Sequence, residues 1–357
     1  MSNNDRGLTG KHVCLFAEAL RNRAGIERMT VELANMLSEL YDVTVILIDK
    51  YDKEASPYRL NEGVRIRSLE SSFRGLNIGN IKRLRGFLRE LRPDVVITVA
   101  TPLVRISAPA MAGMNIRHIS WEHFNLYAGS KAGSVYKMLA AWMVDTTVVL
   151  TEADACDYRK CGAPHIKTIP NFTSIGVNKP SECTEKVVLA VGRHARQKGF
   201  DMLIKAWAKT EADGWMLKIV GSGELMADHK RLAEDAGVAD RIKFMEATSD
   251  IAREFQNASC FVLSSRFEGL VLVLIEAKMM GLPCISFDCP NSPREVIHDG
   301  DDGWLVEAED VDGLAAMLTK RLADMEALRT AGRKGHEDAM SRYSPEAVRK
   351  MWVELIK

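Results

Sequence analysis

Apolar and polar positions follow two different rhythms along the first half of the chain. Short runs rich in β-branched residues are separated by longer stretches in which apolar residues recur every three or four positions. The first rhythm predicts buried strands, and the second predicts amphipathic helices, most clearly at residues 27–40 and 81–91. The predicted strands are residues 12–16, 43–47, 64–68, 95–99, 118–121 and 147–150. This alternation is typical of parallel βαβ units and indicates a doubly wound α/β domain.

The second half repeats the pattern after a polar, turn-forming stretch that starts near residue 173. Its predicted strands are residues 187–191, 216–220, 242–244, 260–263 and 284–287. A chain of 357 residues also exceeds the usual size of a single core. We therefore expect two Rossmann-like α/β domains, residues 1–175 and 176–342, that face each other across a cleft.

The charge balance narrows the possible functions. The 48 basic and 48 acidic residues cancel and form no long cationic run, so an extended nucleic-acid surface is not expected. The first residues lack the pattern of a signal peptide. The most membrane-like stretch, residues 138–150, is too short for a span and is interrupted by Asp145. We expect a cytoplasmic protein, with membrane contact limited to the periphery.

The cysteines also indicate a cytoplasmic protein. Their number is odd and they are scattered, which is typical of reduced, buried thiols rather than of a disulfide framework. The seven positions are Cys14, Cys156, Cys161, Cys183, Cys260, Cys284 and Cys289. Two of them are close in sequence, but no further ligands complete a tetrahedral set, so we expect no zinc site.

Two carboxylates stand near the start of a predicted helix in the second domain. Glu268 and Glu276 lie eight residues apart in an otherwise apolar run, and carboxylates accept hydrogen bonds from hydroxyls. Both can reach one ligand if Glu268 lies in the loop and Glu276 in the first helical turn. The helix would then add the amides of residues 269–271 and its dipole. The alternative is that Glu268 only caps the helix.

Basic residues follow the first strand of the same domain. Arg193 and Lys198 come just after residues 187–191, and ligands of open α/β sheets bind beyond the carboxyl ends of strands. Both residue types neutralise phosphate oxygens, although a solvated basic loop would have the same composition. Together with the two carboxylates, they predict a pocket for an anionic, polyhydroxylated ligand such as a nucleotide-sugar.

The first domain offers weaker signals. Gly25 opens a predicted helix beyond the first strand, where a small residue lets the backbone approach a ligand, although an ordinary strand-to-helix turn explains it equally well. His123 follows residues 118–121, where it either contacts substrate or packs with its aromatic neighbours. The basic stretch 82–92 is either an ordinary amphipathic surface helix or a docking element for anionic lipid.

These motifs together resemble the retaining glycosyltransferases of family four. The resemblance rests on Gly192-Arg193 with Gln197-Lys198-Gly199-Phe200-Asp201, Arg266-Phe267-Glu268-Gly269 through Glu276-Ala277, and Gly281-Leu282-Pro283. It covers nearly the whole chain and implies the two-domain GT-B fold, in which a terminal helix, residues 343–357, packs back onto the first domain. The run Phe287-Asp288-Cys289-Pro290 is similar to the subgroup found in bacterial surface-polysaccharide assembly.

The resemblance also implies roles for the matching residues, and it implies a UDP-linked donor. Members of the family usually need no metal, because Arg and Lys supply the positive charge, so we expect no metal or other cofactor. By this resemblance, Arg193 and Lys198 would bind the diphosphate, and Glu276 would bind the ribose. Glu268 would bind the donor sugar together with the amides of Gly269, Leu270 and Val271. His123 would lie near the sugar, and Gly25 would contribute to donor binding.

The expected activity is transfer of a hexose or N-acetylhexosamine from a UDP-sugar to a hydroxyl of a glycan or lipid-linked acceptor. Retention of configuration and a place in polysaccharide, lipopolysaccharide or capsule biosynthesis follow from the resemblance. Such an acceptor would bring the protein to the inner face of the membrane. Two alternatives stay open from the sequence: a UDP-sugar epimerase of related fold, and a catalytically silent partner subunit.

Overall fold

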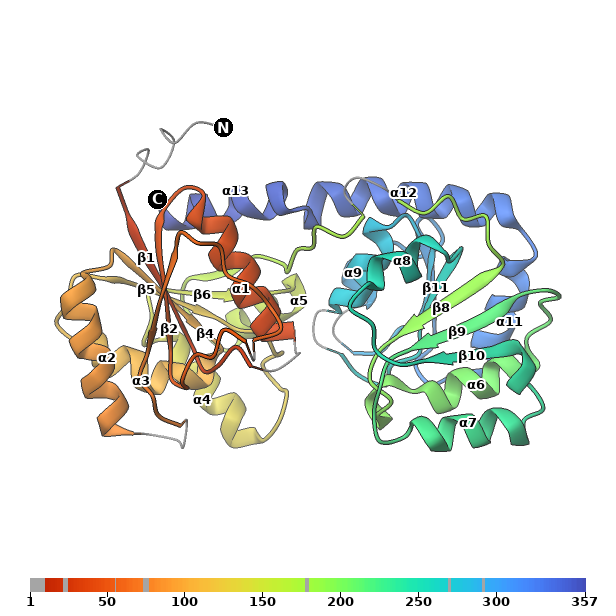
Figure 1. The fold of residues 1–357 in the computed structure, drawn as a ribbon, viewed down its shortest axis with the longest axis horizontal. Coiled ribbons are helices and arrows are strands. Elements are labelled where there is room, and N and C mark those ends of the chain that lie inside the picture. The colour runs from red at the N-terminus through yellow and green to blue at the C-terminus, as the bar shows by residue number, and fades with distance from the viewer. Residues whose placement is uncertain are drawn as a thin grey trace. The chain divides into compact units, whose positions relative to one another are not determined.

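The computed structural model describes residues 10–21, 25–54, 56–72, 77–176, 180–268, 271–290 and 293–357. The chain divides into two compact units, and each consists of a parallel sheet with helices packed against it (Figure 1). Unit 1 comprises Met1–Pro170 together with Arg349–Lys357, and unit 2 comprises Asn171–Val348.

Unit 1 is built on a seven-stranded sheet of order β3-β2-β1-β4-β5-β6-β7, in which every neighbouring pair is parallel. The strands are β1 His12–Ala17, β2 Asp42–Leu47, β3 Val64–Ser68, β4 Val95–Val99, β5 Arg117–Trp121, β6 Thr146–Val149 and β7 Ile166–Thr168. The central strands β1 and β4 are buried along their whole length, which explains their predominantly apolar sequence. The six predicted strands are confirmed, whereas β7 was missed because it is a three-residue edge strand with one buried side chain.

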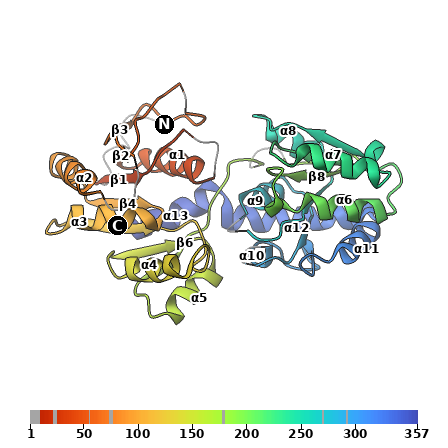
Figure 2. The ribbon, with the colours of Figure 1, turned by 90° about the horizontal axis from the view of Figure 1, so that it is seen from below.

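The helices of unit 1 lie on both faces of this sheet. They are α1 Gly25–Ser38, α2 Ile78–Leu91, α3 Val104–Met111, α4 Lys131–Ala141 and α5 Glu152–Lys160. The crossover from β1 to β2 runs toward one edge of the sheet, and those that carry α2, α3 and α4 run toward the other. Because such crossovers are right-handed, α1 lies on one face and α2, α3 and α4 on the opposite face (Figure 2).

The terminal helix α13, Pro345–Ile356, contributes its second half to unit 1. Trp352 is fully buried and meets Trp121 edge-on, with 5.3 Å between the ring centroids. Lys11 donates hydrogen bonds to the last two carbonyl oxygens of the chain at 2.9 and 2.7 Å. An ion pair of 2.9 Å joins Arg349 to Glu39, so α13 lies beside α1.

Unit 2 is built on a six-stranded parallel sheet of order β10-β9-β8-β11-β12-β13. Its strands are β8 Val187–Val191, β9 Met216–Val220, β10 Ile242–Met245, β11 Cys260–Leu263, β12 Cys284–Phe287 and β13 Gly303–Val306. Its helices are α6 Phe200–Lys209, α7 Met226–Asp235, α8 Ile251–Gln256, α9 Leu272–Met279, α10 Pro293–Val296, α11 Val311–Leu322 and α12 Met325–Tyr343. The five predicted strands are confirmed, and β13 is an additional strand that pairs with β12.

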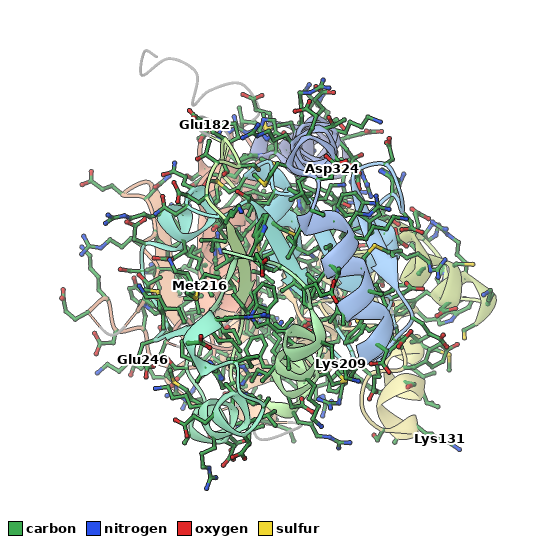
Figure 3. All side chains as sticks on the ribbon, turned by 90° about the vertical axis from the view of Figure 1, so that its right-hand side faces the viewer. Lys131, Glu182, Lys209, Met216, Glu246 and Asp324 are labelled. Carbon is green, nitrogen blue, oxygen red and sulfur yellow. The ribbon has the colours of Figure 1, made fainter. Side chains whose placement is uncertain are left out.

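Two apolar clusters hold the unit 2 sheet between its helices. One gathers Trp207, Trp215 and Trp304, and the other gathers Phe255 and Phe261. Figure 3 draws the side chains as sticks and labels Met216 of β9 and Lys209 of α6. A sheet that is buried on both faces presents only its strand ends to ligands, and the loops that follow the strands therefore carry the candidate site.

Two expectations about the surface can be compared with the structure. All seven cysteines are free and five are buried, but Cys156 and Cys161 are exposed, so the expectation of buried thiols was wrong for this pair. They lie on and just after the polar helix α5, whose sequence has few apolar residues to cover them. Among the described residues, no helix combines the length and apolar character needed to cross a membrane.

Candidate active site

Two loops meet at the carboxyl ends of the paired strands β8 and β11. The loop after β8 contains a 3₁₀ turn, Arg196–Lys198, and the loop after β11 begins at Ser264. The Ser264 hydroxyl donates to the carbonyl of Lys198 at 2.9 Å, and the Arg266 amide donates to the carbonyl of Gln197 at 2.8 Å. These bonds fix the two loops against each other, although about seventy residues of chain separate them.

Two glycines make this close approach possible. A side chain at Gly199 would place its Cβ 2.0 Å from the Ser264 carbonyl oxygen, and the backbone there has a φ of +63°. A Cβ at Gly192 would lie 3.0 Å from the aliphatic carbons of Lys198, so the lysine stem passes directly over this glycine. Packing therefore favours glycine at both positions. Gly199 leaves room for the loop after β11, and Gly192 leaves room for the side chain of Lys198.

A bidentate ion pair closes the same junction. The Arg266 guanidinium donates to both carboxylate oxygens of Asp201, at 2.9 and 2.7 Å, and also to the Arg196 carbonyl at 2.8 Å. The hydrogen bonds from Arg266 hold the pKa of the Asp201 carboxyl below its usual value. Sequence analysis quoted both residues within motifs but did not predict their pairing, because no spacing rule links residues so far apart.

Glu268 sits at the centre of the junction and is buried. Its Oε1 accepts hydrogen bonds from the Lys198 ammonium and the Ser265 hydroxyl, each at 2.6 Å. Its Oε2 accepts one from the Gln197 side-chain amide at 3.2 Å. The structure thus brings two predicted site residues, Lys198 and Glu268, into direct contact. An ammonium has three N–H donors, so Lys198 can contact Glu268 and a phosphate oxygen at the same time.

Glu276 and Val271 belong to the start of α9, and one expectation about them was wrong. The extended Val271 occupies the N-cap position and Leu272 begins the helix, so Glu276 lies in the second helical turn rather than the first. Glu268 is therefore a loop residue and not the helix cap. Glu276 is buried, with 5% of its surface exposed. The predicted donor-binding residues Gly269 and Leu270 lie outside the described residues.

Arg193 is exposed at the end of β8. Within the part of the chain that the structure describes, its side chain has no ion pair, and it is not joined to Lys198 or Glu268. The next residue, His194, is fully buried and faces His229 on α7, with 2.8 Å between the two Nδ1 atoms. One ring must donate to the other, so this contact requires at least one neutral imidazole. The backbone that carries Arg193 is thereby anchored to α7.

The histidine pair predicts a loss of stability in acid. Burial, and then the neighbouring His229, lower the pKa of His194 from 6.5 to about 4. The unfolded chain therefore binds a proton between pH 6.5 and about 4 that the folded chain does not, so the free energy of unfolding decreases as the pH falls through this window. A full shift of this size corresponds to on the order of 3 kcal/mol. Urea denaturation at a series of pH values measures it.

A double variant, His194→Asn with His229→Asn, provides the comparison. Asparagine places an amide near the position of Nδ1 and has no proton to take up, so its unfolding free energy should depend less on pH. Unit 1 adds a dependence of its own, since burial lowers the pKa of His118 to about 4. The prediction therefore concerns the difference between the two proteins, and parallel pH profiles would contradict it.

His123 in unit 1 is buried at the end of β5, 4.3 Å from the Trp121 ring. Burial lowers its pKa to about 3, so the ring is neutral near pH 7 and does not serve there as a cationic acid. Its Nε2 has no hydrogen-bond partner among the described residues. The carboxylate of Glu122 binds the backbone amides of His123 and Phe124, both at 2.9 Å, and so positions the loop through its backbone.

Gly25 is the first residue of α1. A Cβ built at this position meets no atom within 4 Å, so the described residues leave open space beside the start of the helix. Among the described residues, no packing contact requires glycine at this position. Residues 22–24, which complete the predicted loop, lie outside the described residues.

One cluster that sequence analysis missed resembles a metal site but is filled by a lysine. His298, Asp302 and Asp338 place ligand atoms within 4.8 Å of one another. The buried ammonium of Lys278 donates to both aspartates at 2.7 Å and to the Val296 carbonyl at 2.5 Å. The cation that this cluster needs is therefore Lys278 itself. The only available signal was a lysine within the apolar sequence of α9.

Comparison with known proteins agrees with this geometry. The sequence model described as "Glycosyltransferase Family 4" matches residues 23–175, and the one described as "Glycosyl transferases group 1" matches residues 175–338. An uncharacterized glycosyltransferase of Haemophilus influenzae is 33% identical over 322 residues, which cover 86% of this chain and 89% of that protein. A lipopolysaccharide core biosynthesis glycosyltransferase, LpsE of Rhizobium meliloti, is 25% identical over 345 residues, or 93% of this chain and 95% of that one.

The fold is also shared with solved structures. The Anabaena protein HepE, solved in complex with UDP, superimposes with a TM-score of 0.82 at 17% identity over 96% of this chain and 99% of that one. Two Rossmann-like units with parallel sheets, as described above, are those of the GT-B fold. The chain therefore belongs to the group 1 glycosyltransferases of family four, and it is a glycosyltransferase with the GT-B fold that its sequence predicted.

Proposed function

We propose that this glycosyltransferase moves a hexose or N-acetylhexosamine from a UDP-sugar to a hydroxyl of a glycan or lipid-linked acceptor, with retention of configuration. The observation that carries the proposal is the contact between Lys198 and Glu268 at the carboxyl ends of β8 and β11. It combines a phosphate-binding cation with a hydroxyl-binding carboxylate in one rigid junction. The UDP found in the HepE structure and the lipopolysaccharide role in the name of LpsE agree with this donor and acceptor class.

In the proposed site, charged and polar side chains of the protein bind the diphosphate, the ribose and the sugar of the donor. Lys198 and Arg193 neutralise the diphosphate, and Glu276 accepts hydrogen bonds from the ribose hydroxyls. Glu268, together with the backbone of residues 269–271, binds the donor sugar. Because two cations of the protein stabilise the negative charge that develops on the leaving diphosphate, we propose that transfer needs no metal ion.

The proposed reaction proceeds on one face of the sugar. The acceptor oxygen bonds to the anomeric carbon as the bond from that carbon to the diphosphate breaks, and the acceptor proton passes to the departing phosphate oxygen. His123 takes part as a neutral hydrogen-bonding group, because its lowered pKa leaves it uncharged near pH 7. No observation favours the epimerase or the silent partner subunit. We place the reaction in the cytoplasm, at the inner face of the membrane.

Titration calorimetry with UDP, GDP and ADP, without added metal, tests the proposal. We expect UDP to bind selectively, and the Arg193→Ala, Lys198→Ala double variant to bind it at least about 100-fold more weakly, because two charge-assisted hydrogen bonds to phosphate are lost. Uridine, which lacks the phosphates, should lose far less affinity.

The matched control removes two other lysines of unit 2. Lys205 on α6 and Lys320 on α11 are exposed, and neither belongs to the junction. The Lys205→Ala, Lys320→Ala variant should bind UDP as the wild type does. Absence of nucleotide binding, or equal UDP affinity in both double variants, would overturn the proposed site.

A further inference from the structure

Helix α4 presents apolar side chains to solvent along one stripe. Val135, Leu139 and Trp142 are 50%, 59% and 65% exposed, and Met143 follows at 48%. The spacings of four and three residues place the first three on the same side of the helix. The buried residues of α4, Lys137, Ala140 and Ala141, occupy the opposite side. We refer to Val135, Leu139, Trp142 and Met143 as the α4 stripe.

The stripe continues into the loop that precedes α4. Phe124 and Tyr127 are also more than half exposed, so six of the nine large exposed apolar side chains of the described residues fall between positions 124 and 143. Scattered exposed apolar residues are normal, whereas a cluster of this kind indicates a contact surface. On the buried side of the helix, Lys137 donates to the carbonyl of Asn125 at 2.7 Å and ties this loop to α4.

Helices α2, α3 and α4 carry mostly basic charged residues. Helices α2, α3 and α4 cover the same face of the unit 1 sheet (Figure 2), where α2 packs against α3 and α3 shares an apolar cluster with α4. Although the chain as a whole has a net charge of zero, these three helices hold six basic residues that are not buried and one acidic residue. They are Lys82, Arg83, Arg85, Arg89, Arg105 and Lys131, against Glu90. A seventh basic residue, Lys137, is buried beside Glu122 and does not contribute to the surface charge. We refer to α2, α3 and α4 as the basic layer.

We propose that the basic layer docks on an anionic lipid bilayer, with the α4 stripe entering the interface between headgroups and acyl chains. An apolar stripe beside cationic side chains fits a surface that is negatively charged outside and apolar beneath. Trp142 and Tyr127 have the amphipathic rings that favour this interface. Each basic side chain near such a surface strengthens binding roughly fivefold. The inference deepens the proposed function, because a membrane-bound protein meets a lipid-linked acceptor where the lipid anchors it.

Sedimentation of the full chain with lipid vesicles tests the proposal without requiring catalysis. We expect binding to vesicles in which about a third of the phosphatidylcholine is replaced by phosphatidylglycerol, weaker binding to phosphatidylcholine alone, and a decrease as salt is added. The Leu139→Ser, Trp142→Ser variant should bind at least about tenfold more weakly. The control, Met351→Ser, alters an exposed apolar residue of α13 beside α1 and should bind normally.

A second pair of variants isolates the charge. Lys82→Glu with Arg89→Glu should also weaken binding to the anionic vesicles at least about tenfold. Lys350→Glu with Lys357→Glu makes the same change in net charge at two exposed positions on and just after α13 and should have little effect. Circular dichroism verifies that every variant is folded, and UDP titration of the same samples reports on the nucleotide site separately.

Three results would overturn the inference. In the first, the wild-type protein does not prefer anionic vesicles. In the second, the α4 stripe variant binds these vesicles as well as the wild type does. In the third, the only effect of the stripe substitutions is to convert a dimer to a monomer in sedimentation velocity. The last result would assign the surface to a second copy of the chain. Vesicle binding that fails while UDP binding persists rejects the docking surface and leaves the proposed function standing.

Discussion

Replacing Lys278 with methionine is expected to lower the free energy of unfolding of unit 2 by about 3 to 5 kcal/mol. The Lys278 side chain has no exposed surface, and its ammonium is the shared partner of Asp302 and Asp338. Methionine fills a similar volume but leaves two carboxylates around an apolar group. Asp302 is itself 1% exposed, so its charge has no access to water once the ammonium is removed. Chemical denaturation of wild type and variant measures the difference.

Two comparisons separate the buried charge from other effects of the substitution. Lys334→Met removes a second lysine–aspartate pair, with Asp301, whose side chains are about half exposed. Exposed pairs of this kind contribute about 0–1 kcal/mol, so this variant should change stability little. Adding Asp302→Asn to Lys278→Met should recover part of the loss, because the buried carboxylate that has lost its ammonium partner is replaced by a neutral amide. Equal costs for Lys278→Met and Lys334→Met would contradict the prediction.

The sheets could be predicted from the sequence because their strands are buried on both faces. A strand such as β4 must then be mostly apolar and rich in β-branched residues, and the five residues of β4, Val-Val-Ile-Thr-Val, carry that signal without reference to any other part of the chain. β7 escaped prediction for the converse reason, because it is a short edge strand in which only Ile166 is buried. β13 is also a short edge strand, but it is mostly buried, so its four-residue length and the glycine at its start are the features that weakened its signal.

The candidate site was predictable as a set of residue types but not as a set of contacts. Strand ends located Lys198 and Glu268 correctly in loops, since the ends of neighbouring parallel strands share one edge. Their direct contact, and the pairing of Arg266 with Asp201, depend on which strands are neighbours in space, and helical or strand periodicity does not encode that. Glu276 was misplaced by one turn because the extended Val271 delays the start of α9.

The contact between Lys198 and Glu268 leads to the second large prediction: the two residues should act as one unit in transfer. Lys198→Ala and Glu268→Gln should each reduce kcat/KM for UDP-sugar turnover by about 10³-fold, because a fixed charge next to the leaving diphosphate or the donor sugar is lost. The double variant should lose little more than the worse single variant, since either substitution already breaks the shared contact. UDP release with an active donor measures all three.

Unit 2 contains a matched control pair for this experiment. Lys218 and Glu254 form an ion pair of 2.5 Å whose side chains are 14% and 12% exposed, close to the 16% and 8% of Lys198 and Glu268. Lys218 lies within β9 and Glu254 within α8, away from the junction of the two loops. Lys218→Ala and Glu254→Gln should therefore lower stability without a comparable loss of turnover. If the losses at Lys198 and Glu268 instead multiply to about 10⁶-fold, the two residues act independently, and Glu268 does not position the lysine for the phosphate.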